Sequence, residues 1–73
     1  MVYDRLTPYE YLVFVAGLWG IDPARAQAHA TELIGWLGLA PHAHQRCGGF
    51  SKGMLQKVAL AGALVHDPRL IIL

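Results

Sequence analysis

The sequence contains little that could stabilise a small domain covalently. Cys47 is the only cysteine among 73 residues, so the chain can form no internal disulfide and no cysteine-based zinc site. A chain of this length buries only about 60% of the surface that its unfolded state exposes, so marginal stability is expected. The lone cysteine is most simply interpreted as a small residue in a reducing compartment.

Long apolar runs and strong net charge are also missing. The longest uncharged stretch near the start, residues 11–21, is shorter than the roughly 20 apolar residues of a membrane-spanning helix. Asp4 and Glu10 precede it where a secretory signal would carry basic residues, which predicts a cytoplasmic chain. The net charge of +1 divides into −2 over residues 1–45 and +3 over residues 46–73. This weak bias suits a phosphate but lacks the clustered basic face that predicts nucleic acid as a partner.

Apolar side chains, by contrast, are abundant and make up 55% of the residues. That share is high for a domain with so much surface relative to its volume. Part of the apolar surface is therefore expected to face a partner or another part of a longer protein.

The first of three predicted helices has a complete start signal. Thr7, Pro8 and Glu10 form a capping box with proline at the first helical position. The body of this helix, residues 10–19, is apolar almost all round, and Gly20 is expected to end it.

The second helix is predicted to be amphipathic. It begins at Asp22 and Pro23, and Gly38 is placed to adopt the left-handed conformation after its end. The apolar stripe repeats at helical spacing and comprises Ala26, Ala30, Leu33, Ile34 and Leu37. The opposite, polar face is expected to carry Arg25, His29 and Glu32.

The third helix follows a predicted loop over residues 41–50. Ser51 caps this helix, which is expected to run to about residue 66, and small residues such as Gly62 allow other elements to approach closely. Its main apolar stripe is Met54, Val58, Ala61 and Val65. Residues 69–73 then predict a buried parallel strand, which has no sheet to join and therefore favours truncation of a longer protein.

The segment from Gly48 to Met54 has the chemistry of an anion site. Its glycines lead into a helix start whose first N–H groups lack intrahelical partners and whose dipole adds about half a positive charge. Ser51 adds a hydroxyl, Lys52 a cation, and Gly53 permits close approach to the backbone, so phosphate is the expected ligand. Many serine-capped helices bind nothing, and the Walker A pattern G-x-x-x-x-G-K-[ST] is absent.

Other reactive side chains favour simpler interpretations. His42 and His44 could bind a metal only if Cys47 joined them from a flexible loop, so no metal site is predicted. No carboxylate is placed to orient either histidine toward Ser51, so no nucleophilic catalysis is predicted. Without a basic stripe beside them, the aromatic residues are expected to be core or partner-facing anchors, namely Tyr11, Trp19 and Trp36.

Residues 50–73 closely resemble the signature region of ABC transporter ATPases. In that family an L-S-G-G-Q-type motif opens a helix, a [QR]-[KR]-V-x-[IL]-A-x-A-L run follows, and Asp-Pro leads into the Walker B strand. Residues 6–12, Leu-Thr-Pro-Tyr-Glu-Tyr-Leu, resemble the family's L-T-x-x-E-N-L start of the helical subdomain. Lys52 and Met54 replace a glycine and a glutamine, as in efflux branches, while Gly62 and Tyr11 stand where arginine and asparagine are common.

The resemblance implies a mainly α fold, the three-helix ABC helical subdomain, within a parent α/β P-loop NTPase. Residues 1–73 would be a partial ATPase domain, with the helical subdomain at about 5–50 and the signature motif and helix at 50–66. Residues 69–73 would begin a truncated Walker B strand, and the Walker B aspartate and catalytic glutamate would follow it.

The resemblance further implies a site divided between two ATPase subunits that meet head to tail around ATP with Mg²⁺. Ser51, Lys52, Gly53 and Met54 would contact the γ-phosphate of ATP held by the opposite subunit. The chain itself would carry no catalytic residue and no metal ligand, so the isolated chain is expected to be inactive. A transmembrane permease would be the other partner and would hold the subunit on the inner face of the cell membrane.

One alternative interpretation is a stand-alone helical interaction module, whose apolar first helix docks on a partner protein without nucleotide chemistry. On either interpretation, the apolar first helix and the orphan strand predict that the isolated chain self-associates or packs loosely.

Overall fold

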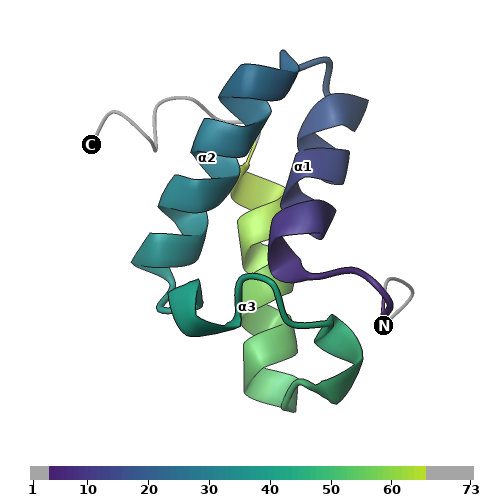
Figure 1. Ribbon diagram of the computed structural model, residues 1–73, viewed down its shortest axis with the longest axis vertical. Helices are drawn as coiled ribbons and strands as arrows, with labels where there is room; N and C mark the ends of the chain where they lie inside the picture. Colours follow the sequence, from purple (N-terminus) through teal and green to yellow (C-terminus); the bar gives the residue numbers. More distant parts are fainter. Residues whose placement is uncertain (1–3, 66–73) are drawn as a thin grey trace.

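A computed structural model describes residues 4–65, which form three α-helices and two short 3₁₀ helices (Figure 1). The α-helices are α1 (Pro8–Leu18), α2 (Pro23–Trp36) and α3 (Lys52–Leu64), and the 3₁₀ helices are η1 (Ala40–His42) and η2 (Cys47–Gly49). The predicted mainly α fold with three helices is confirmed over this range, and the strand predicted at residues 69–73 lies outside it. A bilayer-crossing helix is absent from residues 4–65, where each helix is too short or too polar for that role.

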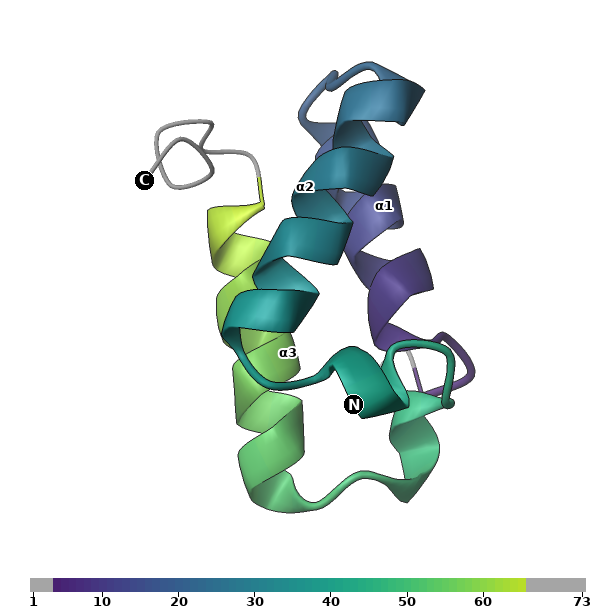
Figure 2. The same cartoon turned by 60° about the vertical axis from the view of Figure 1, so that its left-hand side comes forward.

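The three helices alternate in direction. In Figures 1 and 2, α1 and α3 run from the bottom of the molecule to the top, and α2 runs from the top to the bottom. The connection from α2 to α3 crosses the lower part of the molecule, so α3 begins at the end where α1 also begins.

The predicted starts of α1 and α2 and the glycines predicted after them are confirmed, whereas α3 ends at Leu64, slightly before the predicted end at about residue 66, which lies outside the described residues. Thr7 Oγ1 accepts a hydrogen bond from the Glu10 N–H at 3.1 Å, and Glu10 Oε1 accepts one from the Thr7 N–H at 3.0 Å. Asp22 caps α2 through its carboxylate. Gly20 and Gly38 follow α1 and α2 with φ angles of 77° and 72°, the left-handed conformation that glycine adopts without strain.

The core lies between the three helices. The predicted stripes of α2 and α3 are largely buried, although Leu37 and Met54 are only half-buried. α1 buries a single side, through Leu12 and Ala16, although its sequence is apolar almost all round. The exposed apolar side chains here are Phe14 and Leu18 on α1 and Trp19 at its C-cap, with exposed fractions of 45%, 71% and 62%.

His29 lies in the core, and the prediction that it sits on the polar face of the second helix is wrong. The residue is 6% exposed, and its Nδ1 lies 3.1 Å from the carbonyl oxygen of Val65. Position 29 follows Ala26 by three residues and precedes Ala30 by one, so it borders the buried stripe on the side where α3 packs. Because a carbonyl oxygen only accepts hydrogen bonds, Nδ1 carries the hydrogen.

Candidate functional site

The four residues predicted to contact phosphate lie together at the start of α3. Ser51 is the N-cap, and residues 52–54 form the first turn. We call residues 51–54 the signature turn; it lies at the lower end of the molecule in Figures 1 and 2, beyond the ends of α1 and α2. Ser51, Lys52 and Gly53 are exposed and Met54 is half-buried. The signature turn is therefore accessible to another molecule.

Ser51 is oriented by the helix that it caps. Its backbone is extended, with φ −66° and ψ 164°, and its Oγ accepts a hydrogen bond from the Met54 N–H at 3.2 Å. The Leu55 N–H donates to the Ser51 carbonyl oxygen at 3.0 Å. Accepting a bond uses a lone pair only, so the hydroxyl hydrogen of Ser51 remains able to donate.

The backbone of the signature turn supplies further donors. The N–H groups of Lys52 and Gly53 belong to the first turn, where a helix has no acceptor of its own for them. The positive end of the helix dipole lies at the same place, and the Lys52 ammonium adds a full charge. One hydroxyl, two backbone N–H groups and one cation can thus serve a single anion.

Gly53 has no steric role within the part of the chain that the structure describes. A β-carbon built at this position meets no atom within 4 Å, and the φ angle is not in the left-handed region. A glycine in a helix costs roughly 0.5–1 kcal/mol relative to alanine. The residue thus lowers helix stability without relieving any contact in the fold, and the lack of a side chain leaves the turn open to a ligand.

The segment that leads into α3 is attached to the start of the chain. We call residues 47–50 the strap. The Cys47 N–H donates to the Leu6 carbonyl oxygen, and the Gly48 N–H donates to the Asp4 carbonyl oxygen, both at 2.9 Å. The prediction of a plain loop is therefore incomplete, because η2 and these backbone bonds give the strap a defined path.

Two side chains of the strap reach the core. Cys47 is fully buried, and burial, followed by the nearby Asp4 charge, raises the pKa of its thiol. Such a thiol stays protonated and is a poor nucleophile and metal ligand. Phe50 packs against the core and meets the His42 ring edge-on, with ring centroids 6.0 Å apart. The strap is therefore anchored on both sides of its glycine pair.

The other two histidines of residues 4–65 make local contacts. His42 Nδ1 lies 2.7 Å from Gln45 Oε1, and the His44 ring lies 5.6 Å from the Tyr9 ring. Residues 4–65 contain no group of three or more side chains placed to hold a metal ion.

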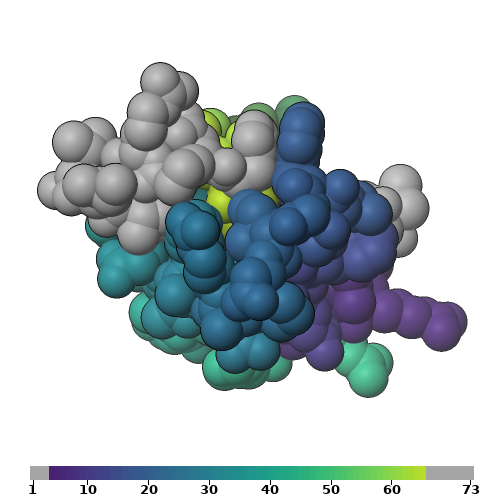
Figure 3. Space-filling model, turned by 90° about the horizontal axis from the view of Figure 1, so that it is seen from above, coloured from purple at the N-terminus to yellow at the C-terminus, as the bar shows by residue number. Residues whose placement is uncertain are grey.

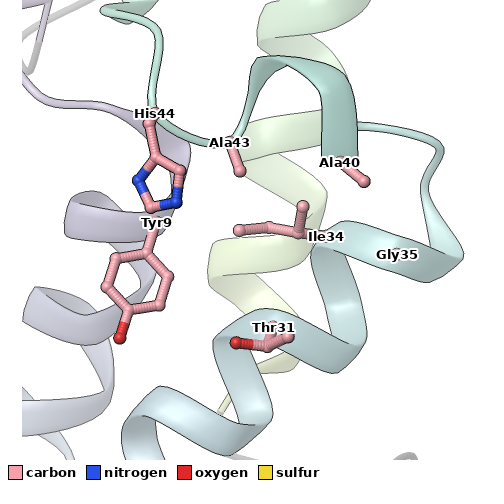
Figure 4. A pocket seen from close by; sticks show the side chains of 7 residues that line it. All are labelled: Tyr9, Thr31, Ile34, Gly35, Ala40, Ala43 and His44. Carbon is pink, nitrogen blue, oxygen red and sulfur yellow. The ribbon is translucent and has the colours of Figure 1, made fainter.

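A hollow of about 360 Å³ lies between α1, α2 and η1 (Figure 4). Tyr9 and His44 form one wall, and Ile34 and Thr31 of α2 lie across from them. Gly35, Ala40 and Ala43 complete the lining. The lining has no lysine, no arginine and none of the residues of the signature turn, so this hollow is not the predicted phosphate site.

Comparison with known proteins identifies relatives along nearly the whole chain. A family model described as ABC transporter matches residues 2–73. The ABC transporter ATP-binding protein NatA of Bacillus subtilis (strain 168) is 42% identical over 71 residues, which cover 97% of this chain and 29% of that protein. A fluoroquinolones export ATP-binding protein of Mycobacterium tuberculosis (strain CDC 1551 / Oshkosh) is 41% identical over 71 residues, covering 97% of this chain and 22% of that protein.

An import protein is also similar. The phosphonates import ATP-binding protein PhnC 2 of Oceanobacillus iheyensis is 34% identical over 64 residues, covering 88% of this chain and 25% of that protein. No solved structure matches the chain significantly. The chain thus spans between 22% and 29% of the length of these three relatives. On the strength of the family match and these identities, the chain belongs to the ABC transporter family of ATP-binding proteins.

Proposed function

We propose that this chain is the part of an ABC transporter ATP-binding subunit that contacts the γ-phosphate of ATP held by the opposite subunit. The observation that carries the proposal is the exposed signature turn, where the Ser51 hydroxyl, the Lys52 cation and the first N–H groups of α3 gather. The family match and the names of the relatives, which are ATP-binding proteins, support ATP as the source of the phosphate.

The proposed domain organisation follows from the same family. Residues 5–50 serve as the helical subdomain, residues 50–66 as the signature motif and its helix, and residues 69–73 as the start of the Walker B strand. The parent is an α/β P-loop ATPase in which other segments hold the nucleotide. The described part of this proposal, residues 4–65, has the helical content that a helical subdomain requires.

Each residue of the signature turn has a proposed task. Ser51 donates its hydroxyl hydrogen to a γ-phosphate oxygen while its Oγ stays fixed by the Met54 N–H. Gly53 donates its N–H at close range because no side chain intervenes. Lys52 balances charge on the phosphate. ATP with Mg²⁺ supplies the phosphoryl group and the metal charge when bound.

This arrangement makes the signature turn a sensor of the third phosphate. The turn holds the opposite subunit only while a γ-phosphate is present, and it releases that subunit after hydrolysis. The partners are therefore a second ATPase subunit and a transmembrane permease, whose docking holds the protein at the cytoplasmic face of the membrane. The Phe50-Ser51-Lys52-Gly53-Met54 form of the motif favours an efflux system.

The test uses the full-length subunit that contains this segment. Ser51→Asp keeps the helix cap, because aspartate caps helices as well as serine does, but directs a carboxylate at the phosphate. We expect ATP turnover to fall by about 100-fold with the affinity for ATP in the same subunit unchanged. Asp22→Ser is the matched control, since it exchanges the same two cap residues on α2, and it should leave turnover unchanged.

Two results would contradict the proposal. Turnover of Ser51→Asp within about twofold of the wild type would show that the turn does not face the phosphate. Absence of ATP hydrolysis by the full-length wild-type protein with its permease would reject the transporter function as a whole. The isolated 73-residue chain is expected to hydrolyse no ATP, and Mg²⁺-dependent turnover by that chain would contradict the division of the site between subunits.

A further inference from the structure

His29 holds the end of α3 that lies opposite the signature turn. Its Nδ1 is 3.1 Å from the carbonyl oxygen of Val65, the residue that caps the C-terminus of α3. Figure 3 views the molecule from this end, where the last turn of α3 lies beside α2 and α1. A side chain of α2 therefore makes a cap for α3 across the helix interface.

The bond satisfies a group that the helix cannot satisfy itself. The last four carbonyl groups of a helix lack an intrahelical donor, and Val65 is fully buried. A buried carbonyl without a donor is unfavourable, because it has lost its hydrogen bonds to water. The imidazole N–H at the negative end of the helix dipole is a well-matched partner. The bond consequently specifies one axial position of α3 against α2.

The same half of α3 is fixed from α1. Gly62 is buried against the Tyr11 ring, which lies closer than a side chain at position 62 would allow. α3 is thus held near its C-terminus from two sides, by His29 through a directional bond and by Tyr11 through packing.

α3 transmits this position to the phosphate site. The helix has 13 residues, which corresponds to roughly 20 Å at about 1.5 Å per residue. A tilt of α3 by about 5° about its Val65 end would displace Ser51 by about 2 Å, and the strap that is bonded to residues 4 and 6 would have to move with it. Contacts to a reacting group tolerate errors in position of only about 0.5 Å. A small change of tilt at the His29 contact would therefore displace Ser51 by more than this tolerance.

We propose that His29 is a positioning residue for the γ-phosphate contact of Ser51. It acts through the Nδ1–H bond to Val65, which sets the tilt and height of α3, and it touches no nucleotide. This inference rests on the proposed function of the signature turn. It assigns a role to a residue about 20 Å from that turn along the helix.

The test compares two variants of the full-length subunit. His29→Asn places an amide N–H near the position of Nδ1, whereas His29→Leu has no donor. We expect His29→Leu to lower kcat at least about tenfold with KM for ATP within about twofold of the wild type. His29→Asn should stay within about threefold of the wild type. His44→Leu, at an exposed histidine, is the control and should change neither constant.

Several results would overturn the proposal. A kcat of His29→Leu equal to that of the wild type would overturn it. Equal losses of kcat in His29→Leu and His29→Asn would also overturn it. If His29→Leu does not fold, His29→Gln is used in its place, because its amide N–H lies near the position of Nε2 and not of Nδ1. A kcat of His29→Gln equal to that of His29→Asn would reject the proposal.

A measurement without turnover separates this proposal from the proposed function. In nitrogen-15 NMR spectra of the full-length protein, His29 should be in the Nδ1–H tautomer, and an Nε2–H tautomer would overturn the inference. The amide resonances of Lys52 and Gly53 should shift in His29→Leu and stay in place in His44→Leu. If these signals behave as expected while Ser51→Asp retains full turnover, the proposed function fails and the helix linkage stands. Unchanged amide resonances would reject the linkage itself.

Discussion

The ring of Tyr11 on α1 occupies the space that any side chain at position 62 of α3 would need. A β-carbon on Gly62 would lie 2.8 Å from Cε2 and 3.0 Å from the hydroxyl oxygen of Tyr11. At both positions the chain differs from the residues that the resemblance leads one to expect, which are asparagine at 11 and arginine at 62. Tyr11 and Gly62 fit each other, because the large ring requires glycine at position 62 and the glycine leaves room for the ring.

We predict that Gly62→Ala destabilises the fold by about 1–3 kcal/mol, because the methyl group forces the ring or the helices to move. Tyr11→Leu combined with Gly62→Ala should recover at least about 1 kcal/mol relative to the sum of the single changes. Chemical denaturation of the four proteins measures this coupling. Additive effects would show that the two residues do not constrain each other.

At Gly53 stability and activity should change in opposite directions. Gly53→Ala should raise the free energy of unfolding by up to about 1 kcal/mol, since alanine favours the helix and meets no atom within 4 Å. In the full-length subunit the same methyl group would stand between α3 and the phosphate, so turnover should fall at least about tenfold.

Gly17→Ala provides the control for this experiment. Gly17 is also exposed on a helix with nothing within 4 Å of a β-carbon, so it should give a similar gain in stability with unchanged turnover. Equal turnover in the two variants would show that position 53 does not face a ligand.

The stability of the fold should decrease at alkaline pH through Cys47. Burial, and to a lesser degree the charge of Asp4, raises the pKa of the folded thiol. The unfolded thiol has a pKa of about 8.5. Above that pH the unfolded state binds fewer protons than the folded state, so the free energy of unfolding falls until the folded thiol also ionises. Below about pH 8 this contribution is fully present.

Urea denaturation between about pH 7 and pH 10 measures the effect, and Cys47→Ala isolates it from other titrating groups. The variant should lose stability less steeply than the wild type above about pH 8.5. Identical slopes would contradict the assignment, as would rapid alkylation of the folded thiol by iodoacetamide near about pH 7.5.

The exposed apolar side chains should make the isolated chain associate. Leu18 is 71% exposed, and Trp36 and Leu60 are 52% and 50% exposed. Leu18→Glu should shift sedimentation profiles toward the monomer without lowering the melting temperature. Leu12→Ala, in the core, should instead cost about 2–5 kcal/mol. A monomeric wild-type chain at high concentration would contradict this prediction.

Local features of this fold could be predicted from the sequence, and features that depend on packing could not. Thr7, Asp22 and Ser51 cap their helices as expected, because a cap involves only the next three residues. The burial of His29 depends on where α3 lies against α2, which the period of a single helix does not contain. The spacing of three residues between Ala26 and His29 favours the buried side of α2. The polarity of the imidazole favours the exposed side, and the prediction followed the polarity.

The candidate site also has features that could be predicted from the sequence and features that could not. The residues of the signature turn are contiguous, so their grouping at one helix start follows directly from the sequence. The bonds of the strap join segments about 40 residues apart through backbone atoms, which carry no residue signature. The proposed γ-phosphate contact would involve a second subunit, and it is a prediction that Ser51→Asp tests.

The strap also has a consequence for the order of folding. The three capped helices can begin to form from nearby residues, but the bonds from Cys47 to Leu6 and from Gly48 to Asp4 must wait for closure of a long loop. The start of α3 therefore reaches its final position late, after the helices have met. A chain that is only partly folded would not yet hold Ser51 in its folded position, so the proposed contact with a second subunit would form only after these bonds have closed.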